Sequence, residues 1–178
     1  MRLDLSPDLV KLATGPKYRF ADWPNPAVPR QPGVYTIWDG ERLLYVGMAG
    51  RAAKASVNPM AIDPLPLDEP KVIPELREIA GLWHRLNSHA SGRRSSDQFC
   101  VYICDRFVVA GLTPEEQVAV RDARLSLDAM TKTFIREALD YRFVATADAA
   151  GALTIEAAIR GGRLPSGPPF LNPDLRRR

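Results

Sequence analysis

The chain has 178 residues, of which 46% are hydrophobic and 25% charged, with a formal net charge of +3. This composition is ordinary for a globular protein, and the length suits one domain with a sizeable core. The charge is too small to indicate a polyanionic partner by itself. No apolar run is long enough to cross a membrane, and the first residues lack the pattern of a secretory signal. We therefore expect a cytoplasmic protein without a membrane partner.

Residues 1–31 are rich in proline, most of all in the stretch 23–29 (WPNPAVP). Proline disfavours helix at the residue before it. We therefore expect an extended N-terminal arm over residues 1–31. A single domain should follow over residues 32–173, with a short basic tail at 174–178.

Residues 33–47 have the pattern of a β-hairpin. Two β-prone runs flank Asp39-Gly40, which is a strong turn dipeptide. Side chains on one face of an antiparallel pair lie opposite each other across the strands. The tyrosines of the two runs, Tyr35 and Tyr45, can therefore converge on one patch.

The middle of the chain alternates between loop and regular structure. A loop is predicted for the proline-rich residues 57–74, and a helix from Pro74 to about residue 90, where apolar residues recur at spacings of three and four. Residues 98–109 are predicted to form a strand. Cys100 and Cys104 would then lie on the same face of that strand as reduced thiols, because this geometry suits a disulfide poorly.

The last third of the chain is predicted to contain a helix that begins near residue 113, followed by three further elements. Residues 113–116 (TPEE) form a capping box, so a helix begins there. A second helix is predicted over 126–140, a strand over 141–146 and a short helix over 153–159. The order lacks the strict strand–helix alternation of a parallel sheet. We therefore predict an α+β fold, with a small, mainly antiparallel sheet flanked by helices.

The two arms of the predicted hairpin carry similar tripeptides, Gly33–Tyr35 (GVY) and Tyr45–Gly47 (YVG), with their tyrosines ten residues apart. This pair resembles the motifs for which the GIY-YIG nuclease superfamily is named. The resemblance covers about residues 32–173, with family-foreign insertions at 52–74 and 113–140. It implies a metal-dependent endonuclease of restriction or repair type that hydrolyses DNA phosphodiester bonds, RNA being a further possible substrate.

The predicted helix before residue 90 carries Arg85 and His89 four residues apart, hence on one helical face. An arginine fork suits a phosphate, and a histidine can relay a proton near neutral pH. The family resembled here has a catalytic arginine on this helix, often followed by a histidine at this spacing. The proline-rich insertion places the helix far from Tyr45 in sequence, so Arg51 is the alternative for the arginine role.

The same resemblance implies that Tyr35, Tyr45 and Asn172 are catalytic. One tyrosine would help to deprotonate the attacking water and the other would position the phosphate, and the sequence does not apportion these roles. Asn172 would hold the phosphate or orient a tyrosine. The alternative for Asn172 is a residue of an ordinary Asn-Pro turn.

The expected cofactor is Mg²⁺ or Mn²⁺, which prefers oxygen ligands. Glu156 is an isolated acid on a small apolar helix, and the family resembled here has a metal-binding glutamate on a late helix followed by a loop with Pro and Asn. Glu156 is therefore the predicted metal ligand. Glu137 is the alternative, although a surface ion pair with a neighbour on its own helix suits it better.

Basic residues gather between positions 84 and 94, where Arg93 and Arg94 follow the predicted Arg85 helix. Arginine side chains there can contact DNA phosphates without reading the sequence. DNA is therefore the expected partner. The alternative function is a non-catalytic nucleic-acid-binding or protein-interaction domain on the same scaffold.

Overall fold

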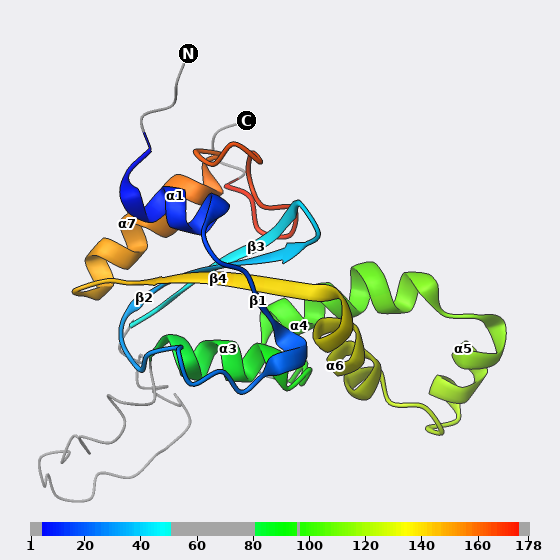
Figure 1. The fold of residues 1–178 in the computed structure, drawn as a ribbon. Coiled ribbons are helices and arrows are strands. Elements are labelled where there is room, and N and C mark those ends of the chain that lie inside the picture. Colours follow the sequence, from blue (N-terminus) through cyan, green and yellow to red (C-terminus); the bar gives the residue numbers. More distant parts are fainter. Residues whose placement is uncertain (1–4, 51–80, 96, 175–178) are drawn as a thin grey trace, which may run out of the picture.

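The computed structural model describes residues 5–50, 81–95 and 97–174. They form a four-stranded antiparallel sheet flanked by helices, which confirms the predicted α+β class (Figure 1). Arg51 and the loop predicted within 52–74 lie outside the described residues. None of the helices in the described part of the chain has the length and apolar character needed to span a bilayer.

The predicted hairpin forms the centre and one edge of the sheet. Strand β2 (Gly33–Asp39) pairs with β3 (Arg42–Ala49) across a turn at Gly40, whose φ of +55° suits a residue without a side chain. Strand β4 (Leu139–Ala145) pairs with the other side of β2, and the short β1 (Tyr18–Arg19) pairs with β4. The strand order is therefore β1-β4-β2-β3, with β3 at an edge.

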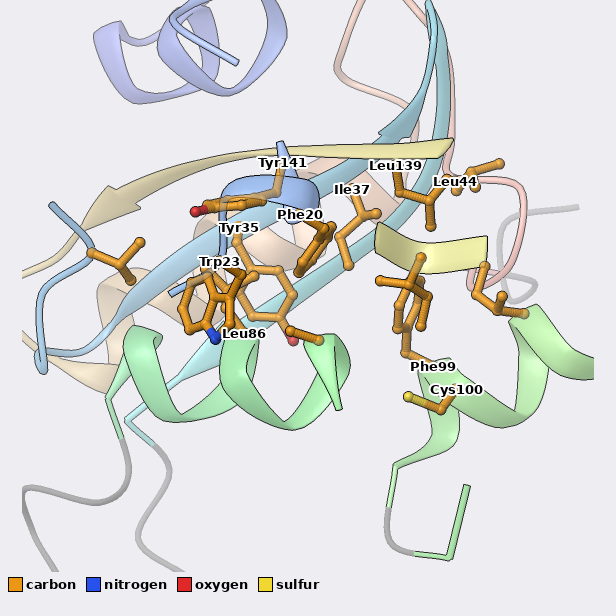
Figure 2. Packing of buried hydrophobic residues seen from close by; sticks show 14 of the residues in the cluster. Phe20, Trp23, Tyr35, Ile37, Leu44, Leu86, Phe99, Cys100, Leu139 and Tyr141 are labelled. Carbon is orange, nitrogen blue, oxygen red and sulfur yellow. The ribbon is translucent and has the colours of Figure 1, made fainter. Parts of the chain in front are cut away.

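Helices cover both faces of the sheet, since successive side chains of a strand point to opposite sides. Helices α3 (Leu82–Ala90), α4 (Gln98–Ile103) and α6 (Leu127–Ala138) cover one face (Figures 1 and 2). Helices α1 (Pro7–Thr14) and α7 (Ala149–Arg160) cover the other face. Each face has its own buried apolar cluster. The α3 face includes Tyr35, Ile37, Leu44, Leu86, Phe99 and Tyr141, and the α7 face includes Val34, Trp38, Leu43, Val46, Val144 and Ile159.

The prediction of an extended arm over residues 1–31 is wrong. This segment contains α1, β1 and a short 3₁₀ helix, η1 (Phe20–Asp22). Ser6 caps α1 by accepting the N–H of Leu9, and Pro7 stands at the start of the helix, where proline is tolerated. Leu12 is fully buried beneath the sheet, so this segment is part of the core.

The prediction of a strand over residues 98–109 is also wrong. Helix α4 continues into a π-helical segment, η2 (Cys104–Val108), and a 3₁₀ turn, η3 (Val109–Gly111). The side chain of Asp97 caps α4 by accepting two backbone N–H groups, and the apolar residues then recur at helical spacing toward the core. The two cysteines are buried and free, as predicted, but lie one helical turn apart.

The later predictions are confirmed with small shifts of boundary. Thr113 forms the expected capping box at the start of α5 (Pro114–Arg121), and α6, β4 and α7 follow in the predicted order. Helix α5 buries none of its residues and extends away from the sheet (Figure 1), whereas α6 packs into the α3-face core through Ile135. The segment predicted as an insertion therefore has one helix that buries no residue and one that packs a single face against the core.

Candidate active site

Four of the predicted site residues come together on the α3 face of the sheet. Tyr35 pairs with Gly47, and Tyr45 pairs with Ile37, so both tyrosines project toward α3. Their ring centroids lie 6.5 Å apart, and the ring of His89 lies 5.3 Å from Tyr35 and 5.9 Å from Tyr45. The charge of Arg85 acts on both phenols.

The glycine of the second tripeptide has a packing role. The Tyr35 ring lies directly over Gly47, and a Cβ atom built at Gly47 would overlap the Tyr35 hydroxyl and ring carbons. Gly47 therefore provides the space that the inward tyrosine occupies. This contact is a physical reason for a glycine two residues after Tyr45.

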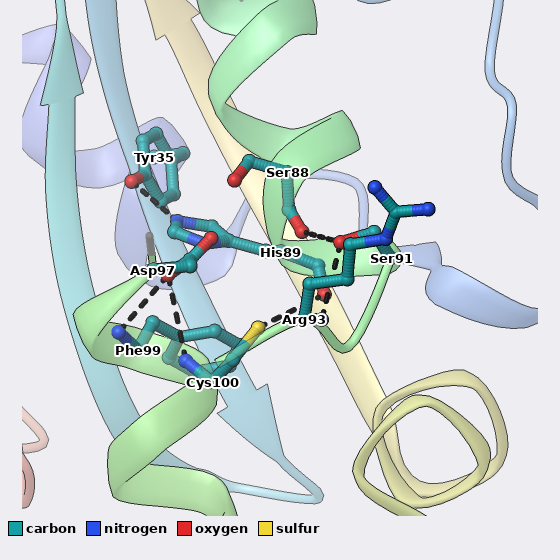
Figure 3. Close-up of polar contacts among 8 residues, drawn as sticks. All are labelled: Tyr35, Ser88, His89, Ser91, Arg93, Asp97, Phe99 and Cys100. Atoms are coloured by element: carbon teal, nitrogen blue, oxygen red, sulfur yellow. Dashed lines mark hydrogen bonds and ion pairs between the residues drawn. The ribbon is translucent and has the colours of Figure 1, made fainter. Parts of the chain in front are cut away.

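A buried hydrogen-bonded chain links three side chains from two separate segments (Figure 3). The Tyr35 hydroxyl lies 2.7 Å from His89 Nε2, and His89 Nδ1 lies 2.6 Å from Asp97 Oδ2. An ionised carboxylate only accepts hydrogen bonds. His89 therefore carries its proton on Nδ1 and accepts the Tyr35 O–H at Nε2.

Burial and hydrogen bonding keep His89 and Asp97 each in one protonation state at neutral pH. Burial lowers the pKa of His89, so the imidazole is neutral. Burial alone would raise the pKa of Asp97, but hydrogen bonds from His89, Ser88 and the Cys100 N–H outweigh it and lower that pKa below its usual value. Asp97 is therefore a carboxylate beside a neutral imidazole.

The two tyrosines differ in their access to solvent. Tyr35 is 0% exposed, and burial raises its pKa well above 10. Tyr45 is partly exposed, and burial raises its pKa to about 12. Both phenols are therefore protonated at neutral pH. Arg85 is solvent-exposed and lies one helical turn before His89 on α3, and its interaction with the Tyr35 phenol opposes the effect of burial on the Tyr35 pKa.

Asp97 is the site residue that the sequence analysis missed. It follows His89 by eight positions and stands directly before the apolar run of α4. An aspartate in that position is a typical helix N-cap, and this signal was available in the sequence. Predicting a strand for residues 98–109 concealed it.

Glu156 lies on α7, which packs against the opposite face of the sheet from α3. Helix α7 runs along the edge strand β3, and the half-buried Glu156 acts on the Tyr45 phenol by raising its pKa. The charge of Glu156 therefore acts on Tyr45, although α7 packs on the other face of the sheet from α3.

Asn172 lies at the same edge. Its amide nitrogen donates to the Val46 carbonyl at 2.7 Å, and its amide oxygen accepts the Val46 N–H at 3.2 Å. The side chain thus pairs with the strand backbone next to Tyr45. Because its amide bonds to backbone on both sides, its position favours orienting Tyr45 over holding a phosphate.

The remaining candidates lie apart from the tyrosines. Arg93 is exposed, whereas Arg94 forms an ion pair of 2.6 Å with Asp128 on α6. Glu137 is exposed on α6, and no contact in the described part of the chain joins it to the tyrosine pair. A polar hollow of about 430 Å³ beside α3 is lined by His84, Asn87, Ser88, Ser91, Arg93 and Lys132.

The residues present fit a singly anchored divalent cation better than a protein cage. Within residues 5–50, 81–95 and 97–174, no group of three or more His, Cys, Asp or Glu side chains could hold a metal. Mg²⁺ is commonly held by one or two carboxylates, with waters and substrate phosphates as the other ligands. A single carboxylate such as Glu156, whose charge acts on the Tyr45 phenol, is compatible with that arrangement.

Comparison of the chain with protein-family models, with curated proteins and with solved structures found no match. The chemistry and geometry of this site are therefore the observations that bear on the function of the chain.

Proposed function

We propose that the chain is a metal-dependent endonuclease of GIY-YIG type that hydrolyses DNA phosphodiester bonds in the cytoplasm. The observation that supports this proposal is the convergence of Tyr35, Tyr45, Arg85 and His89. They come from β2, β3 and α3, and Tyr35 and His89 are 54 residues apart in the sequence. The resemblance implies this set, and their packing on one face of the sheet is compatible with it.

Two of these residues reach solvent and can meet a substrate. The side chain of the exposed residue Arg85 can bind a phosphate through charge-assisted hydrogen bonds and stabilise the negative charge that grows in the transition state. Tyr45 has a pKa of about 12 and therefore donates a hydrogen bond to the phosphate more readily than it accepts a proton.

Glu156 is the residue proposed to hold Mg²⁺ or Mn²⁺ at this site. A bound divalent cation supplies charge stabilisation and lowers the pKa of a bound water. Glu156 itself would anchor the cation at the edge of β3, where its charge acts on the Tyr45 phenol. Asn172 would keep the strand backbone in place beside Tyr45.

The duplex would approach over the exposed side of α3. Arg93 and Lys132 border the polar hollow there, and no acidic side chain lines it. Cations on such a surface contact phosphates regardless of base sequence. Arg94 contributes less, because its guanidinium is already paired with Asp128.

Cleavage of plasmid DNA and of RNA, with Mg²⁺ or with a chelator, tests the proposal. We expect DNA cleavage that needs the metal, and a loss of about 100-fold or more in Glu156→Gln and in Arg85→Ala. Glu137→Gln is the matched control, because that glutamate is exposed on α6, and it should cleave like wild type. A loss in Glu137→Gln with full activity in Glu156→Gln would show that the wrong carboxylate was chosen.

The complete burial of Tyr35 and His89 favours a second candidate, a non-catalytic nucleic-acid-binding or protein-interaction domain. Buried polar groups are normally hydrogen-bonded for stability alone. In that case wild type would bind DNA without cutting it, with either metal. Tyr35→Phe would then lower the free energy of unfolding and leave DNA affinity unchanged.

A further inference from the structure

The buried chain from Asp97 to Tyr35 ends at the solvent-exposed Arg85. His89 is 0% exposed at its side chain and Asp97 3%, so water does not compete for the bond between them. Arg85 lies one helical turn before His89 on α3, and its guanidinium interacts with the Tyr35 phenol. The buried hydrogen-bonded side chains thus approach the surface at the exposed Arg85.

We propose that Asp97 is a positioning residue that acts through His89 and Tyr35 to orient the Arg85 guanidinium. The effect on phosphate binding rests on the proposed nuclease function, whereas the direction of each hydrogen bond does not.

The hydrogen bonds from Asp97 to Arg85 run in one consistent direction, because each side chain has a defined donor or acceptor role. Asp97 only accepts, so the His89 proton lies on Nδ1 and the lone pair on Nε2. Tyr35 then donates its O–H to Nε2. The remaining lone pairs of the Tyr35 oxygen are free to accept from Arg85, which only donates. Reversing any one of these bonds would set two donors or two acceptors against each other.

The start of α4 holds the first member of the chain in place. Asp97 Oδ1 accepts the N–H groups of Phe99 at 3.0 Å and Cys100 at 3.4 Å, which leaves Oδ2 for His89 (Figure 3). The Phe99 ring packs against the imidazole at 4.7 Å between centroids. The helix cap and the hydrogen-bonded chain therefore share one carboxylate, so the capping geometry fixes the imidazole.

The charged and titratable groups around His89 come from every element packed against it. Tyr35 comes from β2, Tyr45 from β3, Arg85 from the same helix, and Asp97 and Cys100 from the α4 segment. Asp97 is the anion among them that bonds the ring directly. The proton position on the imidazole therefore depends chiefly on Asp97.

This arrangement assigns different roles to the two tyrosines. Tyr35 has no exposed surface, so it acts on the substrate only through Arg85. Tyr45 is partly exposed and can touch the phosphodiester itself. Tyr35 is thus a positioning residue, and Tyr45 is the tyrosine that meets the substrate.

Asp97→Asn tests the direction of the chain. The asparagine retains an oxygen to cap α4, but its amide would donate to His89 Nδ1 and move the ring proton to Nε2, toward the Tyr35 oxygen. The protein has only two histidines, so a ¹⁵N-histidine NMR spectrum is simple, and His84→Gln assigns the exposed ring. We expect the Nδ1–H form of His89 in wild type and the Nε2–H form in Asp97→Asn.

A double-mutant cycle tests whether the chain acts as one unit. Asp97→Asn and Tyr35→Phe should each lower kcat by about 10- to 100-fold, the range typical of residues that orient a site group. The double variant should be no slower than the slower single one. Asp148→Asn is the matched control, because Asp148 caps α7 as Asp97 caps α4 but is exposed, and it should cleave like wild type.

Two results would overturn the proposal, and each is distinct from failure of the proposed function. An Nε2–H form of His89 in wild type would do so even in an active nuclease and needs no variant. Losses that multiply in the double variant would show that Asp97 and Tyr35 act independently. A wild-type protein with Nδ1–H His89 that cuts neither DNA nor RNA would instead overturn the nuclease function while supporting the hydrogen-bond direction.

Discussion

Replacing Gly47 by alanine should destabilise the protein through a single contact. A Cβ atom at this position would overlap the Tyr35 hydroxyl and ring, so the ring must shift. The shift is opposed because Tyr35 is fully buried and bonded to His89 at 2.7 Å. Gly47 has an ordinary backbone conformation, so the effect comes from packing and not from φ.

The expected cost is the sum of two effects. Overpacking of a well-filled core costs about 1–3 kcal/mol. Moving the Tyr35 hydroxyl leaves the buried Nε2 of His89 without its donor, which costs about 1–3 kcal/mol more. The lower conformational freedom of alanine in the unfolded chain returns about 0.5–1 kcal/mol. We therefore expect Gly47→Ala to lower the free energy of unfolding by about 1–5 kcal/mol.

Urea unfolding followed by intrinsic fluorescence measures this loss. Gly111→Ala is the matched control, because a Cβ there meets no atom within 4 Å. In the Tyr35→Phe background Gly47→Ala should cost less, since the hydroxyl oxygen is the atom nearest the new methyl group. The reasoning is refuted if Gly47→Ala unfolds at the same urea concentration as Gly111→Ala.

Three further perturbations address the charges and the sheet edge. Burial lowers the pKa of His89, so below pH 6.5 the unfolded protein binds a proton that the folded protein does not. The free energy of unfolding should therefore be highest above pH 6.5 and fall below that pH by at most about 1.4 kcal/mol per pH unit. Urea titrations at several pH values measure this dependence. His89→Gln should flatten this slope, and the exposed His84→Gln should keep it. Arg93→Ala should reduce the salt dependence of DNA binding by about one counterion, and the ion-paired Arg94→Ala by less, in gel-shift titrations; equal reductions would contradict the difference. Asn172→Ala removes two bonds to the edge strand and should lower the urea midpoint by the equivalent of about 1–3 kcal/mol, whereas an unchanged midpoint would show that the edge is held by other contacts.

The hairpin and most helices could be predicted from the sequence because their signals are local. Asp39-Gly40 selects a tight turn, and Thr113 caps the helix that Pro114 begins. These interactions join residues within about four positions of each other. They form in much the same way whatever the rest of the chain does.

The two wrong predictions concern segments whose local signals conflict. The apolar run after Asp97 fits a buried strand or a buried helix by its composition, and the aspartate cap with packing against α6 selects the helix. The prolines around residues 23–29 led to the prediction of an extended arm over residues 1–31, and that prediction missed the helix that begins at Pro7. Packing of Leu12 beneath the sheet decides that case.

The chemistry of the site was predicted only as a set of candidates. Spacing in the sequence indicated that Tyr35 and Tyr45 share one face of the hairpin and that Arg85 and His89 share one face of a helix, and the family resemblance implied that the two pairs form one site. Which face of the hairpin contacts which face of the helix depends on how the helix packs against the sheet.

Tertiary structure alone decided the partners of each group. Asn172 bonds to Val46 across 126 residues, and Tyr35 bonds to His89 across 54. Such pairs form because burying apolar faces brings distant segments together, and the buried polar groups must then find partners within reach. The same burial makes Tyr35 an inward residue and leaves Arg85 at the surface, a difference that no local pattern in the sequence records.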